Sequence, residues 1–203
     1  ASKNGNIDGI KKLEELKNLG VIKTATLKEE FDFIKESSSE NNTVIFQKYK
    51  VLSDKGYAPA IFELANCYEQ GLGVAEDYKK AIELYEKSAE LDNTEAMERL
   101  YEIYRGNPTY PRNREKMKFF INVLAATDDY YMYRLAMIRL EDKEYKKAYN
   151  LFYHLAKKDE GLGYVGLGIM LRDGLETKKD YEKAYKYINY AWDEKNNYDG
   201  VYN

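Results

Sequence analysis

Apolar and small residues recur along most of the chain at the spacing of one helix face, and short polar stretches separate the runs. Two such runs follow each other between residues 58 and 93. Their apolar or small members are Ala60, Leu64, Ala65 and Tyr68 in the first run, and Ala81, Leu84, Tyr85 and Ala89 in the second. Intervals of three and four residues place each set on one side of an α-helix. The pattern predicts a helix pair joined by EQGLGVAEDY.

The helix pair is repeated along the chain. Residues 94–129 align with residues 58–93 without a gap, a shorter copy covers 130–160, a fourth covers 161–197, and residues 43–57 look like the second half of a copy. A single helix pair leaves an apolar face open, so several pairs must stack to build a core. The fold class predicted is all-α. The leucines that share one position, and that we expect in the core, are Leu64, Leu100, Leu135 and Leu167.

The glycines of EQGLGVAEDY raise the question of a phosphate-binding loop. Such a loop needs a preceding strand and the spacing GxxxxGK[ST], and the sequence shows neither. The second copy has Asn107 and Thr109 where the first has its two glycines. A helix-joining turn tolerates that change. We therefore expect Gly71 to end the first helix in a left-handed conformation, with Gly73 helping the chain to turn back.

Residues 1–40 follow a different pattern and form a separate predicted unit, ahead of the repeats at 43–203. Two short helices are expected, with a stop at Gly20 and a capping box made by Thr26 and Glu29. The order LxxLxxxGVI followed by EEF is similar to the SHOCT module, a small helical hairpin of bacterial proteins. The alternative is a hairpin that caps the open face of the first repeat.

Composition narrows the classes of function. The net charge is −3 with both signs interleaved, which argues against a nucleic-acid binder because such a protein needs a basic face. No apolar run reaches about 18 residues, so no membrane insertion is expected. A single cysteine forms no internal disulfide, and the start ASKNGNIDGI lacks an apolar signal core. A reducing, cytoplasmic location is the expectation.

Catalytic and metal-binding residues are scarce. His154 falls at a position expected on the outer surface, and Cys67 shares its position with Ile103, Ile138 and Met170, which predicts a core residue. One histidine and one cysteine do not make a zinc site, and no cofactor or catalytic residue is predicted. The one acid pair worth testing as a hydrolase centre is Glu98 with Glu102, one helical turn apart.

The run AxxxLAxxYxxGxGVxxDYxKAxxLYxKSA, from Ala60 to Ala89, resembles the Sel-one-like repeat, a two-helix variant of the tetratricopeptide repeat. The resemblance covers roughly residues 43–197 and is strongest in the first and fourth copies. It implies a right-handed α-solenoid of stacked antiparallel helix pairs, here with an N-terminal helical hairpin cap. Members of the family mostly serve as protein-binding scaffolds and adaptors, often in bacterial systems, and are rarely catalytic.

The resemblance also implies that the first helix of each pair lines a concave groove that binds a partner protein or peptide. The residues expected to face that groove are Phe62, Asn66 and Glu69; Glu98, Glu102 and Arg105; Tyr133, Met137 and Leu140; and Val165, Ile169 and Arg172. This groove is acidic in its middle and apolar towards its C-terminal end. The alternative for Val165 and Ile169 is that the segment WDEKNNYDGVYN covers them.

The leading hypothesis is a non-enzymatic interaction scaffold with a protein or peptide partner. A narrower alternative is a bacterial immunity protein that neutralises a toxin or inhibits an effector, since an acidic groove suits a basic target. Further alternatives are a homo-oligomer built through the N-terminal hairpin, and a hydrolase.

Overall fold

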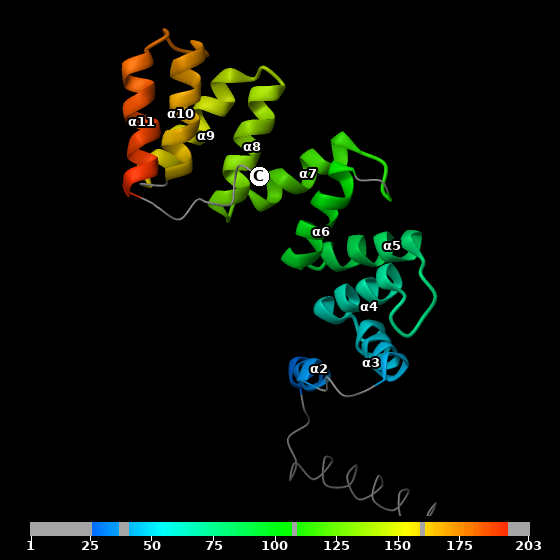
Figure 1. Ribbon diagram of the computed structural model, residues 1–203. Helices are drawn as coiled ribbons and strands as arrows, with labels where there is room; N and C mark the ends of the chain where they lie inside the picture. Colours follow the sequence, from blue (N-terminus) through cyan, green and yellow to red (C-terminus); the bar gives the residue numbers. More distant parts are fainter. Residues whose placement is uncertain (1–25, 37–40, 107–108, 159–160, 195–203) are drawn as a thin grey trace, which may run out of the picture. The chain divides into compact units, whose positions relative to one another are not determined.

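The structure is a computed structural model that describes residues 26–36, 41–106, 109–158 and 161–194 (Figure 1). Within these ranges every regular element is an α-helix. The first predicted helix of the N-terminal hairpin lies outside the described residues. The helices are α2 Leu27–Glu36, α3 Asn42–Asp54, α4 Ala58–Gln70, α5 Tyr78–Ala89, α6 Thr94–Arg105, α7 Arg114–Leu124, α8 Asp129–Glu141, α9 Tyr145–Lys157, α10 Gly161–Asp173 and α11 Tyr181–Glu194.

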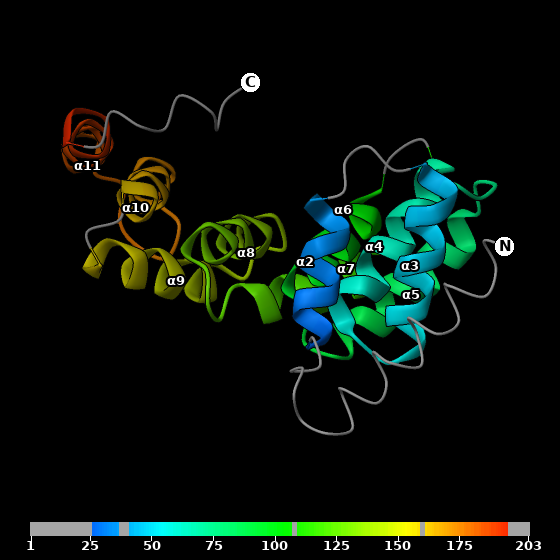
Figure 2. The same ribbon diagram turned by 90° about the horizontal axis from the view of Figure 1, so that it is seen from below.

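The helices pair in the way that the sequence repeat predicts. α4 packs on α5, α6 on α7, α8 on α9 and α10 on α11, and α3 precedes them as a single helix against α4. The chain forms two compact units, one of residues 1–93 and one of residues 94–203, and each is described by itself. In the second unit α10 lies beside α9 and α11 in both views (Figures 1 and 2).

In three of the four helix pairs the second helix is capped by the residue at one repeated position, and α9 has no such side-chain cap. Asp77 accepts a hydrogen bond from the backbone N–H of Lys80 at 2.9 Å, and Asn113 and Asp180 cap α7 and α11 in the same way. These side chains satisfy N–H groups that the first turn of a helix leaves open. Thr26 and Glu29 form the predicted capping box at α2, with both reciprocal hydrogen bonds present.

The two glycines of the first loop have separate structural roles. Gly71 ends α4 at φ 68°, which confirms the predicted left-handed cap, and Gly174 repeats it at φ 72° after α10. Gly73, at φ 73°, passes so close to the backbone of Asn42 that a Cβ would overlap it. The glycines therefore join helices and let a loop reach α3. This geometry confirms the turn and not the phosphate loop.

The core of each unit contains the residues that the repeat predicts. Leu64 in the first unit and Leu100, Leu135 and Leu167 in the second are all buried. Cys67 is also buried, at 4% exposure, and burial with help from the charge of Glu63 raises the pKa of its thiol to about 11. At neutral pH this thiol is protonated and serves as a small apolar group, as predicted.

Glycines inside α10 allow an unusually close helix pair. A Cβ at Gly163 would overlap the backbone of Ala156 on α9, and a Cβ at Gly166 would overlap the ring of Phe152. Phe152 and Leu155 are fully buried in the same cluster as Leu162, Leu167 and Met170. Because α10 has no side chain at these two positions, its backbone packs directly against the backbone of α9 and the ring of Phe152.

Candidate functional site

The second unit has a cavity of about 420 Å³ between the pair α6–α7 and helix α8. Its walls come from α6, from the loop before α7, from α7 itself and from α8. The lining residues are Tyr101, Arg105, Arg112, Met117, Tyr133, Arg134, Met137, Ile138 and Glu141. We call this the α6–α8 cavity. Three of the residues predicted to face the groove, Arg105, Tyr133 and Met137, are among them.

The floor of the α6–α8 cavity is apolar. Met117 and Ile138 are buried, and Met137 is half-buried against the core. Tyr133 is only 4% exposed and packs on Phe152 with ring centroids 5.8 Å apart. An apolar side chain of a ligand would find a surface of thioether, aliphatic and aromatic groups here, of the kind that adapts to different shapes.

The rim of the α6–α8 cavity is basic. Arg134 lines the cavity and donates to the hydroxyl of the buried Tyr101 at 3.2 Å, which holds its guanidinium beside that hydroxyl. Arg105 pairs with Glu102 at 2.7 Å and lies 5.8 Å from the centre of the Tyr101 ring. Arg112 is exposed and makes no ion pair with any residue that the structure describes. Against these three arginines the lining holds one carboxylate, Glu141.

The predicted acidic middle of the groove does not line this cavity. Glu102 is engaged by Arg105, and Glu98 accepts a hydrogen bond from Tyr131. Burial raises the pKa of Tyr131 above its ordinary range, and the nearby charge of Glu98 adds to that shift. The prediction counted residues on α6 alone and missed Arg112 on the loop and Arg134 on α8. In the structure the charge at the cavity is positive.

Both carboxylates proposed as a hydrolase pair therefore have structural partners. Glu102 is exposed and ion-paired, while Glu98 supports a tyrosine on the next helix pair. His154 is exposed on α9, as predicted. Among the residues described, no group of three or more His, Cys, Asp or Glu side chains is placed to hold a metal ion.

In the first unit the predicted groove residues surround one buried side chain. The hydroxyl of Tyr85 lies 2.6 Å from Asn66 Oδ1 and 2.7 Å from Glu69 Oε2, so its single proton is shared between two acceptors. Phe62 packs on the same ring at 5.6 Å. All three groove residues are half-buried. Their contacts stabilise the α4–α5 pair, and partner binding at these residues stays a prediction.

Tyr133 lines the α6–α8 cavity and also packs on the second helix of its own pair. Tyr133 on Phe152 repeats the packing of Phe62 on Tyr85, at the equivalent positions of their copies. At this position the ring contacts the second helix of its own pair, and partner binding at Tyr133 stays a prediction. The remaining predicted residues of the second unit are half-buried at Leu140, Val165 and Ile169 and exposed at Arg172, which pairs with Asp173 at 2.7 Å.

Six residues of the cavity were missed from the sequence: Tyr101, Arg112, Met117, Arg134, Ile138 and Glu141. The sequence held a signal for four of them, namely helical spacing that places residues on one face. Tyr101 lies one turn before Arg105, and Arg134, Ile138 and Glu141 follow each other at intervals of four and three. Arg112 and Met117 come from the irregular loop and the following helix. Repeat spacing does not place the residues of such a loop.

Two segments match a model of a known repeat family. Residues 58–93 and 161–191 match the Sel1 repeat, and they coincide with the α4–α5 and α10–α11 pairs. The chain contains Sel1 repeats. Proteins built from them are helical solenoids that typically mediate protein–protein interaction and generally lack catalytic activity. None of the described helices has the length and apolar character needed to cross a membrane.

Known proteins similar to the chain include two curated fungal ones. Chitin synthase regulatory factor 2 of Schizosaccharomyces pombe is 27% identical over 132 residues, which is 58% of this chain and 26% of that protein. Chitin synthase regulatory factor 3 of the same organism is 37% identical over 59 residues, 29% of this chain and 6% of that protein. The chain thus spans about a quarter or less of these relatives. Both of these relatives are fungal, so a bacterial source for this chain stays a prediction.

A solved Sel1 repeat protein from Oxalobacter formigenes has the same fold. It superposes with a TM-score of 0.67 at 15% identity, over 82% of this chain and 51% of that one. At this identity the likeness concerns the arrangement of helices and no ligand. It supports the helical repeat architecture that the sequence predicts.

Proposed function

We propose that this chain is a non-enzymatic interaction module that binds a segment of a partner protein in the α6–α8 cavity. The observation that carries the proposal is the cavity itself, in which an apolar floor is rimmed by three arginines and one glutamate. Such a site suits a chain segment that inserts one apolar side chain and places carboxylates on either side of it. Arginine binds carboxylates through paired N–H donors, which fixes the orientation of the ligand.

Two further observations support this proposal. Glu102 and Glu98 on α6 are engaged by Arg105 and Tyr131, so they are not arranged as an acid and base for catalysis. The fungal relatives carry the name of regulatory factors, and regulation is a role that a binding module can fill. A helical repeat that presents a site to a partner segment fits both observations.

Selection from a displayed library of random peptides tests the proposal. We expect the chain to enrich peptides with acidic residues on both sides of a large aliphatic residue such as leucine. Arg112→Glu, which reverses the exposed charge at the rim, and Met137→Asp, which adds a charge at the floor, should each abolish the enrichment. Lys146→Glu makes the same charge change on the exposed side of α9 and should leave it intact.

Two results of the selection would contradict the proposal. Enrichment that survives both Arg112→Glu and Met137→Asp would place binding elsewhere on the chain and reject the cavity. Enrichment of basic peptides would reject the charge argument. Circular dichroism of each variant shows whether the helices are intact, so a folding defect is not mistaken for a lost site.

A further inference from the structure

A second cavity, of about 500 Å³, lies in the second unit between α9 and α11, with α10 as its floor. We call it the α9–α11 furrow. It shares no lining residue with the α6–α8 cavity, and it is formed mainly by the second helices of two successive pairs, whereas the α6–α8 cavity is built around first helices. A ligand of the furrow is therefore independent of the function proposed for the α6–α8 cavity.

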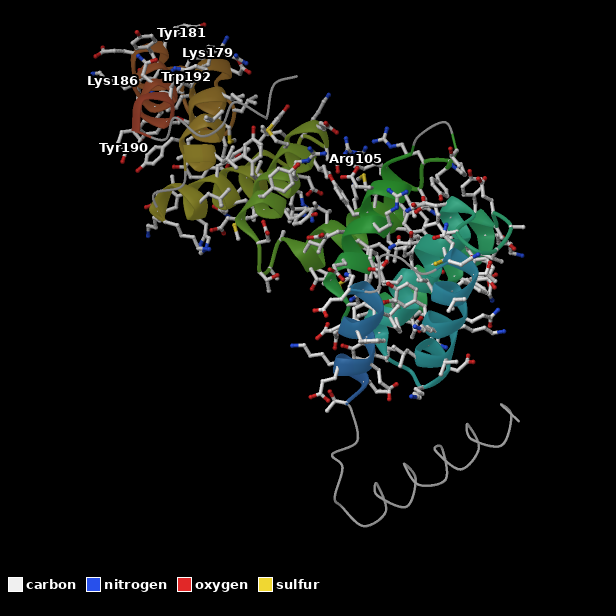
Figure 3. The ribbon with its side chains drawn as sticks, turned by 60° about the horizontal axis from the view of Figure 1, so that its bottom comes forward. Arg105, Lys179, Tyr181, Lys186, Tyr190 and Trp192 are labelled. Atoms are coloured by element: carbon white, nitrogen blue, oxygen red, sulfur yellow. The ribbon has the colours of Figure 1, made fainter. Side chains whose placement is uncertain are left out.

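Four of the ten residues that line the furrow are tyrosines. Tyr149 and Tyr153 on α9 are stacked with ring centroids 6.0 Å apart and planes 10° from parallel. Tyr164 on α10 meets Tyr187 on α11 edge-on at 5.6 Å, and it also contacts Tyr190, which Figure 3 labels on α11. Alanine and leucine side chains lie beneath these rings. The furrow thus offers flat apolar faces with hydroxyl groups at their edges.

Two lysines give the furrow its charge. The ammonium of Lys157 lies 5.0 Å from the centre of the Tyr153 ring, and that of Lys183 lies 5.5 Å from the centre of the Tyr187 ring. Neither forms an ion pair with a residue that the structure describes, and no aspartate or glutamate lines the furrow. The tyrosine faces hold both ammonium groups at the opening, where they are ready to meet an anion.

We propose that the α9–α11 furrow is a second binding site, and that it takes an acidic peptide segment containing an aromatic residue. An aromatic side chain of the ligand would stack among the four tyrosines, and its neighbouring carboxylates would meet Lys157 and Lys183. Rigid tyrosines are well suited to peptide surfaces, since they offer contact area at low entropic cost. A phosphate ligand is less well matched, because no arginine lines the furrow and the backbone N–H of Lys183, in the first turn of α11, is already capped by Asp180.

A labelled synthetic peptide of glutamates interrupted by phenylalanines is the probe, and its fluorescence anisotropy with the full chain is the measurement. We expect saturable binding that weakens with added salt. The double variant Lys157→Glu with Lys183→Glu should weaken binding by at least about tenfold. Tyr153→Ser, at a ring that is 46% exposed, should weaken it several-fold, to a degree typical of an interface aromatic residue.

A matched charge change outside the furrow provides the control for the double variant. Lys87→Glu with Lys146→Glu makes the same charge change at two exposed lysines outside the furrow and should leave binding unchanged. Equal loss in that control would show unspecific attraction and overturn the site. Loss with Arg112→Glu, together with full binding by the Lys157 and Lys183 double variant, would assign the peptide to the α6–α8 cavity instead.

Changing the probe tests the chemistry of the ligand. A peptide with serines in place of the phenylalanines should bind at least about tenfold more weakly, and one with lysines in place of the glutamates should not bind. Equal binding of the serine peptide would overturn the aromatic part of the proposal. Displacement of the probe by inorganic triphosphate at similar concentration would show that the furrow recognises phosphate, and would overturn the peptide assignment. Failure of the probe to bind the wild type would reject the furrow as a peptide site.

Discussion

Leu100 contributes to the core of the second unit with its whole side chain, because none of its surface is exposed. Leu100→Ala removes buried apolar atoms and leaves a cavity that the neighbouring helices fill only in part. We expect the free energy of unfolding to fall by about 2–5 kcal/mol. Urea unfolding followed by circular dichroism measures the change.

Leu91 provides the comparison for that measurement. It is the same residue type at 47% exposure, so Leu91→Ala should change the free energy of unfolding far less. Equal effects of the two substitutions would mean that Leu100 is not packed in the way the structure shows.

Asp142 connects two helices of the second unit through its carboxylate. Lys118 Nζ lies 2.6 Å from its Oδ2, and Arg114 pairs with its Oδ1, both from α7. Hydrogen bonds from Lys118 and Arg114 hold the pKa of Asp142 below its ordinary value of 3.8. A carboxyl group whose pKa is lowered by folding stabilises the folded chain at neutral pH. That contribution fades as the pH falls below 3.8 and through the folded pKa.

The pH dependence of Asp142→Asn tests this pair of ion contacts. We expect the variant to be less stable than the wild type at pH 7, and the difference in unfolding free energy to shrink as the pH is lowered through the acid range. Lys118→Met should remove part of the same pH-dependent difference. A difference that stays constant with pH would show that the carboxylate charge contributes nothing.

At the scale of elements, the glycines of α10 set how closely two helices pack. Alanine is favoured over glycine inside a helix by about 1 kcal/mol, so Gly163→Ala would stabilise an isolated α10. In the folded chain the new Cβ would overlap the backbone of Ala156, which a rigid helix does not relieve. We expect a net destabilisation of about 1–3 kcal/mol, the usual cost of overpacking.

Asn150→Ala is the matched change for Gly163→Ala. It also raises helix propensity, at an exposed position of α9 where the side chain faces solvent. Its unfolding free energy should equal or slightly exceed that of the wild type. If Gly163→Ala behaves in the same way, α9 and α10 are further apart than the structure places them.

Several features of these elements were readable from the sequence because one or two residues determine each of them. The capping box needs only Thr26 and Glu29, and the left-handed cap needs only Gly71. The contact of Tyr133 with Phe152 was not readable, since apolar residues occur all around α8. The orientation of the Tyr133 ring depends on its contact with the ring of Phe152, and the repeat offset alone does not reveal that contact.

At the scale of the whole molecule, the repeat was predictable and its cavities were not. The all-α fold follows from a pattern that recurs in every copy. Each cavity depends on where the copies differ, as at the loop that carries Arg112 and at the tyrosines of α9 and α11. Such differences are not periodic, so they become interpretable only when the helices are placed in space.

The division into two units predicts where the chain can be cut. Residues 94–203 contain both cavities and a core of their own, so we expect this fragment to be helical and to unfold cooperatively. A fragment of residues 112–203 lacks α6, and it would expose Met117 and leave Phe120 without the ring of Tyr104 that stacks on it at 6.1 Å. We expect this shorter fragment to lose cooperative unfolding in at least its α7 region.

Thermal unfolding followed by circular dichroism compares the two fragments, and the acidic peptide probe adds a test of function. The longer fragment should bind the probe with the affinity of the full chain, because every residue that lines the furrow is retained. A longer fragment that is unfolded would show that the second unit depends on residues 1–93. A shorter fragment that unfolds as cooperatively as the longer one would show that α6 is dispensable for the core, contrary to the complete burial of Leu100.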